Sequence, residues 1–289
     1  MAYSVTHPAL TPGRGAVITG AASGIGLATA VRLAAMGLKT VLADLPGAAL
    51  DAAAETVAKA AKGGKLDVMA VPTDVAKIDD VRRLRELAFN SFGDIAFVMN
   101  NAGVEATAGS YNDYAGWQKV LGVNLWGVIN GVHEFAPALI AQKKPAHIVN
   151  TGSKQGITTP PGNTAYNVSK AGVKVTTEAL AHSLRNEPGC QVSAHLLIPG
   201  FVFTGMTARG RTEKPADAWT PEQTVDFMLE SLARGDFYIL CPDGAVTRDM
   251  DERRMEWAAN DIIRNRPALS RWHADYKDAF DVHMKAPKT

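Results

Sequence analysis

Short apolar runs alternate with longer helical patterns along most of the chain, and this alternation restricts the fold more than any other feature. A short run without polar alternation is typical of a strand that is buried on both faces of a parallel sheet. The expected strands are 15–19, 39–43, 66–71, 95–99, 146–151, 191–198 and 236–241, and the expected helices are 24–36, 47–62, 77–92, 112–142, 163–186 and 221–234. The sequence therefore predicts an α/β fold with a single doubly wound parallel β-sheet of about seven strands and helices on both faces.

A glycine-rich turn follows the first expected strand. Residues 20–26 read Gly-Ala-Ala-Ser-Gly-Ile-Gly, so three glycines stand between a buried strand and a helix. Such glycines let the backbone approach a pyrophosphate, which then lies at the helix N-terminus. Asp44 ends the second strand, roughly 20 residues further on, where a carboxylate can bind the ribose hydroxyls of adenosine. These features predict a dinucleotide site; the alternatives are an ordinary strand–helix connection and, for Asp44, a helix N-cap.

Tyr166 and Lys170 form the strongest chemical signal. They are four residues apart in an expected helix, so both side chains lie on one face, a turn apart. A phenol normally titrates near ~10, and an ammonium within a few Å favours the phenolate and lowers that pKa. The pair can therefore act as a general acid/base, with Ser153 supplying a hydroxyl that holds a carbonyl or alcohol oxygen. The alternative is an exposed helix that happens to contain both residues.

Several motifs together resemble the short-chain dehydrogenase/reductase family. They are the turn at 19–26, Asn100-Asn101-Ala102-Gly103, Asn124, Ser153, the Tyr166–Lys170 pair and the stretch 199–204. They occur in the family's order and spacing over about residues 14 to 205. The resemblance implies a Rossmann-type sheet and an enzyme that transfers hydride between a nicotinamide cofactor and a CH–OH group.

The resemblance also implies a role for each matching residue. The catalytic residues are Asn124, Ser153, Tyr166 and Lys170, of which Asn124 holds a water beside the lysine and Lys170 also binds the nicotinamide ribose. The cofactor-binding residues are Gly20, Ser23, Gly24, Ile25, Gly26, Asp44, Leu45, Asp74, Val75, Asn101, Ala102, Gly103, Tyr166, Lys170, Pro199, Gly200, Val202 and Thr204. The substrate residues are Ser153, Gln155, Tyr166, Glu105, Phe201 and Met206. A helix cap for Asp74, a sheet brace for Asn101 and ordinary loop positions for Glu105, Gln155, Phe201 and Met206 are the alternatives.

Asp44 determines the expected cofactor. A carboxylate accepts hydrogen bonds from the 2′- and 3′-hydroxyls and repels a 2′-phosphate. By the family pattern, an NADP-preferring relative would carry Arg or Lys beside that position or just before the second glycine, and here those places hold Leu45 and Ser23. We therefore expect NAD.

Composition excludes several other classes of function. The formal net charge of the 289 residues is +1, without a dense basic patch, so nucleic acid is not an expected partner. No apolar run is long enough to span a membrane, and residues 1–13 lack the apolar region of a signal peptide. The two cysteines, Cys190 and Cys241, have no CxxC spacing, which fits a reducing cytoplasm. The seven histidines do not cluster, so no metal site is expected.

The C-terminal part departs from the family pattern. Residues 205–220 are expected to form a mobile substrate loop, and 245–289 a helical extension in which 245–265 is a long helix. No repeat or linker marks a second domain, so residues 1–289 are expected to form one NAD-binding domain. Relatives pair the helices expected at 112–142 and 163–186 across a two-fold axis, which implies a homodimer or homotetramer. The aromatic residues of the tail are expected to cover an interface or a substrate entrance.

Taken together, these residues predict NAD-dependent oxidation of a secondary alcohol to a ketone, with Tyr166 as the general acid/base. A carbonyl reductase that works mainly in the reverse direction and an NAD-binding regulatory protein without turnover are the alternatives. The complete set of catalytic residues argues against the regulatory protein. The identity of the small-molecule alcohol or carbonyl substrate does not follow from the sequence.

Overall fold

Seven parallel strands form one sheet in the computed structural model, which describes residues 8–106, 108–208 and 210–286. The strands are β1 (Gly15–Thr19), β2 (Lys39–Asp44), β3 (Val68–Pro72), β4 (Ile95–Asn100), β5 (Ala146–Thr151), β6 (Val192–Ile198) and β7 (Tyr238–Leu240). Their order in the sheet is β3-β2-β1-β4-β5-β6-β7, and every neighbouring pair is parallel. The predicted fold class is therefore confirmed.

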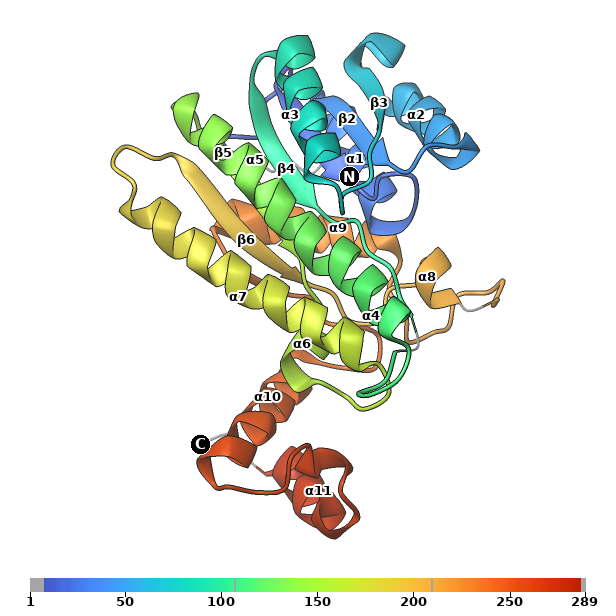
Figure 1. Cartoon of the computed structure of the whole chain (residues 1–289), viewed down its shortest axis with the longest axis vertical. Coiled ribbons are helices and arrows are strands. Elements are labelled where there is room, and N and C mark those ends of the chain that lie inside the picture. Colours follow the sequence, from blue (N-terminus) through green and yellow to red (C-terminus); the bar gives the residue numbers. More distant parts are fainter. Residues whose placement is uncertain (1–7, 107, 209, 287–289) are drawn as a thin grey trace.

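Helices cover both faces of the sheet because successive strand residues point to opposite sides. In β1, Ala16 and Ile18 contribute to one hydrophobic core, whereas Val17 contributes to the other. The first core is closed by α1 (Gly24–Met36), α2 (Ala48–Ala60) and α9 (Pro221–Arg234). The second is closed by α3 (Ile78–Phe92), α5 (Gly127–Ala141) and α7 (Thr164–Asn186), which cross the near face in Figure 1.

The helix expected at 112–142 is interrupted. It consists of α4 (Tyr114–Leu121), a π-helical turn at Gly122–Trp126, and α5. All three segments have right-handed helical backbone at their junctions, so the chain continues in one direction. A π turn adds one residue per turn and is frequent at functional sites. Here it carries Asn124, whose side chain is buried.

The segment between β6 and α9 contains little regular secondary structure. Residues Gly205–Ala208 form α8, and the end of the expected substrate loop pairs with the segment just before the loop. Trp219 N–H donates to Phe201 O at 2.9 Å, and Phe203 N–H donates to Trp219 O at 2.8 Å. This pairing fixes both ends of the loop, whose residue 209 lies outside the described residues.

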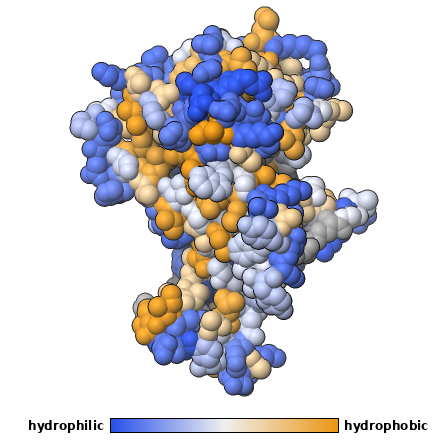
Figure 2. Space-filling view, viewed as in Figure 1, coloured by the Kyte–Doolittle hydropathy of each residue, from blue (hydrophilic) through white to orange (hydrophobic). Residues whose placement is uncertain are grey.

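The C-terminal extension forms a small lobe that projects from one end of the molecule (Figures 1 and 2). It contains α10 (Arg248–Ile263), two short 3₁₀ turns and α11 (Lys277–Lys285). Trp257 is buried within the lobe, where its ring packs edge-on against Phe280 with 5.3 Å between centroids. Its indole N–H donates to Ser270 Oγ at 2.9 Å. The lobe thus buries some of its own aromatic residues.

Two expectations about the chain ends fall partly outside the described residues. Residues 1–13, where no signal peptide is expected, are described only from Pro8, and the C-terminal extension only to residue 286. Within the described segments, no helix combines the length and the apolar character needed to cross a membrane.

Candidate active site

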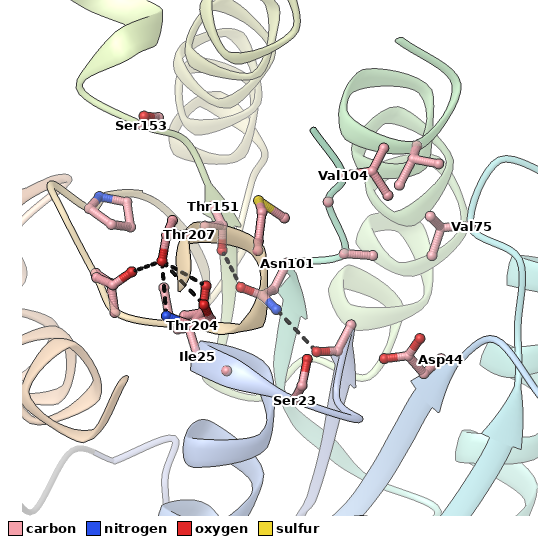
Figure 3. Close-up of a pocket in the computed structure, with 18 of the residues that line it drawn as sticks. Ser23, Ile25, Asp44, Val75, Asn101, Val104, Thr151, Ser153, Thr204 and Thr207 are labelled. Carbon is pink, nitrogen blue, oxygen red and sulfur yellow. Dashed lines mark hydrogen bonds between the residues drawn. The ribbon is translucent and has the colours of Figure 1, made fainter. Parts of the chain in front are cut away.

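A pocket of about 300 Å³ lies at the carboxyl edge of the sheet. Its walls come from the chain that follows β1, β2, β3, β4, β5 and β6. Strand order reverses between β1 and β4, and the crevice outside such a reversal is where open α/β sheets bind ligands. Figure 3 shows Asp44 and Ser153 at opposite ends of this pocket.

The turn after β1 has a backbone that only glycine fits. Gly20 has a positive φ of 66°, and a Cβ there would lie 2.8 Å from Ala102 Cα. A Cβ on Gly26 would overlap Gly20 O, so this glycine lets α1 pack closely against the turn. The described lining residues include Gly20, Ser23, Gly24 and Ile25 but not Gly26. Of the predicted cofactor residues, Gly26 therefore lies behind the pocket wall.

The N-terminus of α1 opens into the pocket. Ser23 makes no side-chain capping bond, and the first turn carries no acidic residue. The backbone N–H groups and the positive end of the helix dipole are therefore available to an anion. This is the electrostatic arrangement that binds phosphate groups.

Asp44 lies at the far end of the pocket, but it does not cap α2, whose N-cap is Gly47. Its Oδ2 accepts from Ala22 N–H at 2.9 Å, and its Oδ1 accepts from Leu45 N–H at 2.8 Å. A carboxylate has about four lone-pair positions, so acceptor capacity remains on both oxygens. The two backbone bonds hold the carboxylate in place at the pocket rim.

Asn101 both lines the pocket and braces the sheet. Its amide nitrogen donates to Thr19 O at 3.1 Å, and its Oδ1 accepts from Thr151 Oγ1 at 3.2 Å. The residue thereby joins the ends of β1, β4 and β5. Asp74 also lines the pocket; its Oδ1 accepts from Ala76 N–H at 3.1 Å, and Lys77 rather than Asp74 is the N-cap of α3.

Asn124 lies behind the pocket wall rather than in it. Its Oδ1 accepts from Val104 N–H at 2.8 Å, and its Nδ2 donates to Val104 O at 3.0 Å and to Ser169 Oγ at 3.3 Å. Val104 itself lines the pocket. In this structure Asn124 therefore positions the irregular segment after β4 and contacts α7.

Tyr166, Lys170 and Ser153 meet at the other end of the pocket. Lys170 Nζ lies 5.7 Å from the centroid of the Tyr166 ring and donates to Thr151 O at 2.7 Å. The hydroxyl of Ser153 interacts with that of Tyr166, and Ser153 Oγ accepts from Gln155 N–H at 3.2 Å. Helix α7 brings Tyr166 and Lys170 together because they are four residues apart and therefore lie on one face of the helix.

Burial dominates the titration of both α7 residues. It raises the pKa of Tyr166 to about 12, with Ser153 acting in the opposite sense and the nearby Glu105 charge adding to the rise. The expected lowering of this pKa by Lys170 is therefore wrong for the protein without cofactor, because burial of the phenol outweighs the groups that favour its charged form. Burial also lowers the pKa of Lys170 to about 8. Desolvation disfavours each charged form, and such paired shifts are typical of functional sites.

The predicted substrate residues divide between the pocket and its surroundings. Ser153, Tyr166 and Met206 line it, whereas Gln155, Glu105 and Phe201 do not. Gln155 instead contributes its backbone to Ser153, and Glu105 acts on Tyr166 through its charge. Every other predicted residue not named so far lies at the pocket: Leu45, Val75, Ala102, Gly103, Pro199, Gly200, Val202 and Thr204.

Some lining residues were not predicted. They are Ala43, Thr73, Val104, Val123, Thr151, Gly152 and Thr207. Thr73, Thr151 and Gly152 lie at or just after the carboxyl ends of expected strands, so their place in the pattern could have indicated them. Val123 belongs to the π turn and Thr207 to α8, and neither carries a comparable signal.

Comparison with known proteins gives consistent results. A family model described as short chain dehydrogenase matches residues 14–215. The 1-deoxy-11-beta-hydroxypentalenate dehydrogenase of Streptomyces arenae is 35% identical over 256 residues, which is 84% of this chain and 88% of that protein. A solved short chain dehydrogenase/reductase from Burkholderia phymatum in complex with NAD has a TM-score of 0.78 at 35% identity, over 88% of this chain and 96% of that one. A metagenomic short-chain oxidoreductase in complex with NADP has a TM-score of 0.66 at 27% identity, over 81% and 98%.

Proposed function

This chain belongs to the short-chain dehydrogenase/reductase family of oxidoreductases, and on that premise we propose that it oxidises a secondary alcohol to a ketone with NAD. The observation that carries the proposal is the meeting of Ser153, Tyr166 and Lys170 at one end of the pocket. The same residues serve the reverse reaction, in which the tyrosine donates the proton instead of accepting it. We also propose that the chain acts as one NAD-binding domain in the cytoplasm, which its two free cysteines support.

The residues of the pocket fit a nicotinamide dinucleotide. The glycine turn leaves room where a Cβ would otherwise stand, and the uncapped start of α1 suits the pyrophosphate. Asp44 would accept from the hydroxyls of the adenosine ribose, and Lys170 would bind the nicotinamide ribose. Bound NAD would supply the hydride acceptor.

NAD is favoured over NADP by the charges of the pocket. Among its described lining residues Lys170 is the single positively charged side chain, and it lies beside Tyr166 rather than beside Asp44. The neighbour of Asp44 is Leu45, an exposed apolar residue. A 2′-phosphate would therefore meet a fixed carboxylate without a compensating cation.

The proton chemistry rests on three side chains. Ser153 holds the substrate oxygen, and Tyr166, as phenolate, takes the hydroxyl proton of the alcohol. Burial and the Glu105 charge oppose the phenolate, whereas Ser153 favours it. The ammonium of Lys170, 5.7 Å from the centroid of the Tyr166 ring, would add the attraction of its positive charge. Lys170 is held in place by Thr151 O and cannot swing into solvent without losing that bond.

Tyr166→Phe tests the proposal because it removes the hydroxyl and keeps the ring. General acid–base catalysis contributes about 10²–10⁴ in rate, so we expect kcat to fall that far while NADH binding persists. Formation of NADH would be followed with secondary alcohols, aryl carbinols and polyols as substrates. Tyr114→Phe, at an exposed position on α4, is the matched control and should retain full turnover. A Tyr166→Phe variant with more than about half the activity would refute the mechanism, as would an unmodified protein that reduces NAD with none of these alcohols.

A further inference from the structure

A buried cluster of charges connects the C-terminal extension to the active site. Lys154 directly follows Ser153, and its Nζ lies 2.6 Å from Asp251 Oδ2 and 3.3 Å from Asp243 Oδ2. Asp251 belongs to α10, whereas Asp243 lies between β7 and α10. The side chains of Lys154, Asp251 and Asp243 are 15%, 6% and 8% exposed, so two carboxylates share one ammonium with little access to water. Arg254, one turn along α10, adds a further positive charge near Asp251.

The same cluster supports the pocket wall on the cofactor side. Asp243 Oδ2 accepts from Phe201 N–H at 3.2 Å, and Lys154 N–H donates to Pro199 O at 3.2 Å. A Cβ on Gly200 would overlap Asp243 Oδ2 and would lie 3.0 Å from Lys154 Cε. The backbone of residues 199–201 therefore rests directly on the ion cluster, and Pro199 and Gly200 line the pocket.

Ser153 depends on the same segment. Its Oγ accepts from Gln155 N–H, and its carbonyl accepts from Gly156 N–H at 3.0 Å in the first turn of α6 (Gln155–Thr158). Lys154 stands at the start of that turn, as its N-cap. A shift of Lys154 would therefore move the backbone that orients the Ser153 hydroxyl.

Stability alone gives a poor account of this cluster. Taking charges out of water is costly, and a buried ion pair is often no more stabilising than apolar residues of the same size. Burial raises the pKa of Asp251, an effect that its bond to Lys154 opposes. Such a cluster is better explained as a device that fixes one geometry of the groups around it. Its partner on α10 belongs to the extension, which lies beyond the residues 14–215 that match the family model.

We propose that Asp251 is a positioning residue of the active site: it holds Lys154 and thereby fixes both Ser153 and the wall formed by residues 199–201. The inference rests on the proposed function for its kinetic consequence, but its structural consequence can be measured without turnover. The extension is then part of the catalytic architecture although none of its described residues lines the pocket.

The test compares Asp251→Asn with Asp249→Asn. Both aspartates lie in the first turn of α10, but Asp249 is more exposed and bonds Arg253 on its own helix. In Asp251→Asn, amide hydrogen exchange at Lys154 and Phe201 should quicken by roughly tenfold or more, because their bonds to Pro199 and Asp243 loosen. kcat per NADH-binding site should fall roughly tenfold, since small displacements at a reacting centre are costly. Asp249→Asn should match the unmodified protein in both measurements.

A double-mutant cycle with Lys154→Gln provides the second arm. If both residues act through one junction, the double variant should lose no more kcat per site than the worse single variant. Multiplied losses would overturn the inference, as would an Asp251→Asn protein with lower Tm but unchanged exchange and kcat per site. If Asp251→Asn alone does not fold, the double variant, which has the same net charge as the unmodified protein, is compared with Lys154→Gln. Exchange at Phe201 as slow as in the unmodified protein would then overturn the inference. An unmodified protein without NAD-linked turnover would refute the proposed function instead, and the exchange data would still decide this inference.

Discussion

Lys170 carries a charge that its surroundings disfavour. The side chain is buried, its Nζ donates to Thr151 O at 2.7 Å, and burial lowers its pKa from 10.5 to about 8. At neutral pH the residue is therefore a buried ammonium, which is less well solvated in the protein than it would be in water. The proposed function explains its presence, since the same charge would favour the phenolate of Tyr166 and its N–H groups would suit a ribose.

Lys170→Met should consequently make the protein more stable at neutral pH while turnover is lost. The lowered pKa corresponds to about 3 kcal/mol, and the lost bond to Thr151 O offsets about 1 kcal/mol, so the free energy of unfolding should rise by about 2 kcal/mol at pH 7. Between about pH 8 and 10.5 the unfolded chain holds a proton that the folded protein has released, so the stability of the unmodified protein increases with pH across this window. The advantage of the variant should therefore shrink above pH 8.

Urea unfolding of both proteins at pH 7 and near pH 10 would measure these differences. Lys174→Met is the matched control, because Lys174 lies one turn further along α7 and pairs with Glu178 at the partly exposed helix surface. The free energy of unfolding of Lys174→Met should differ from that of the unmodified protein by the same amount at both pH values. A Lys170→Met protein less stable than the unmodified one at pH 7 would contradict the account.

Elements that follow from local pattern were predictable from the sequence. The strands lie within about two residues of their expected bounds, because a buried parallel strand needs a continuous apolar run. The β1–α1 turn was also predictable, since a positive φ at Gly20 and the close approach at Gly26 leave no other residue type. Most of the pocket residues follow from these elements and from the family resemblance.

Elements that depend on distant contacts were not predictable. Asn124 of the π turn at Gly122–Trp126 bonds the backbone of Val104, which lies 20 residues earlier in the chain. The periodicity of apolar residues in a helix gives no sign of such a contact. Helix α11 has no buried residue, and it contacts the Trp257 ring through Phe280 and His283. The junction of Lys154 with Asp251 joins residues that are distant in sequence, so spacing alone could not indicate it.

The β1–α1 turn and the end of β2 together determine the next prediction, which concerns the cofactor. Asp44 is held by Ala22 and Leu45 backbone N–H groups, and no cation stands beside it among the described lining residues. We expect kcat/KM to be at least roughly tenfold higher with NAD than with NADP, about 1.4 kcal/mol. Asp44→Ala combined with Leu45→Arg should narrow or reverse that ratio, because it removes a negative charge and supplies a phosphate ligand.

The comparison needs both cofactors assayed side by side with one alcohol. Asp51→Ala is a control on the exposed surface of α2, and it should leave the ratio unchanged. Equal kcat/KM values for NAD and NADP in the unmodified protein would refute the assignment of Asp44.

At the level of the whole molecule, large apolar side chains are exposed beside α7 and on the C-terminal lobe, as well as at other positions such as Leu66 and Tyr111. On the side of α5 and α7 they are Trp126, Val168 and Val175, which are 56%, 43% and 62% exposed. Val168 and Val175 are seven residues apart on α7, so they lie on one face of the helix. On the C-terminal lobe they are Ile262, Ile263 and Val282, at 87%, 76% and 69%. Patches of this kind mark contacts with other chains, and a two-fold dimer buries one patch against its own copy.

We predict that the α7 surface makes the primary dimer contact. Light scattering after size-exclusion chromatography at micromolar concentration should give a mass of at least two chains. Val175→Arg should reduce it to one, because two arginines would meet across the axis without a partner. Ile262→Arg places the same charge at a more exposed position on α10 and should leave the dimer intact, although it would break a tetramer whose second contact uses the lobe. A monomeric unmodified protein would refute the assembly, and dissociation of the dimer by Ile262→Arg but not by Val175→Arg would place the contact on the lobe instead.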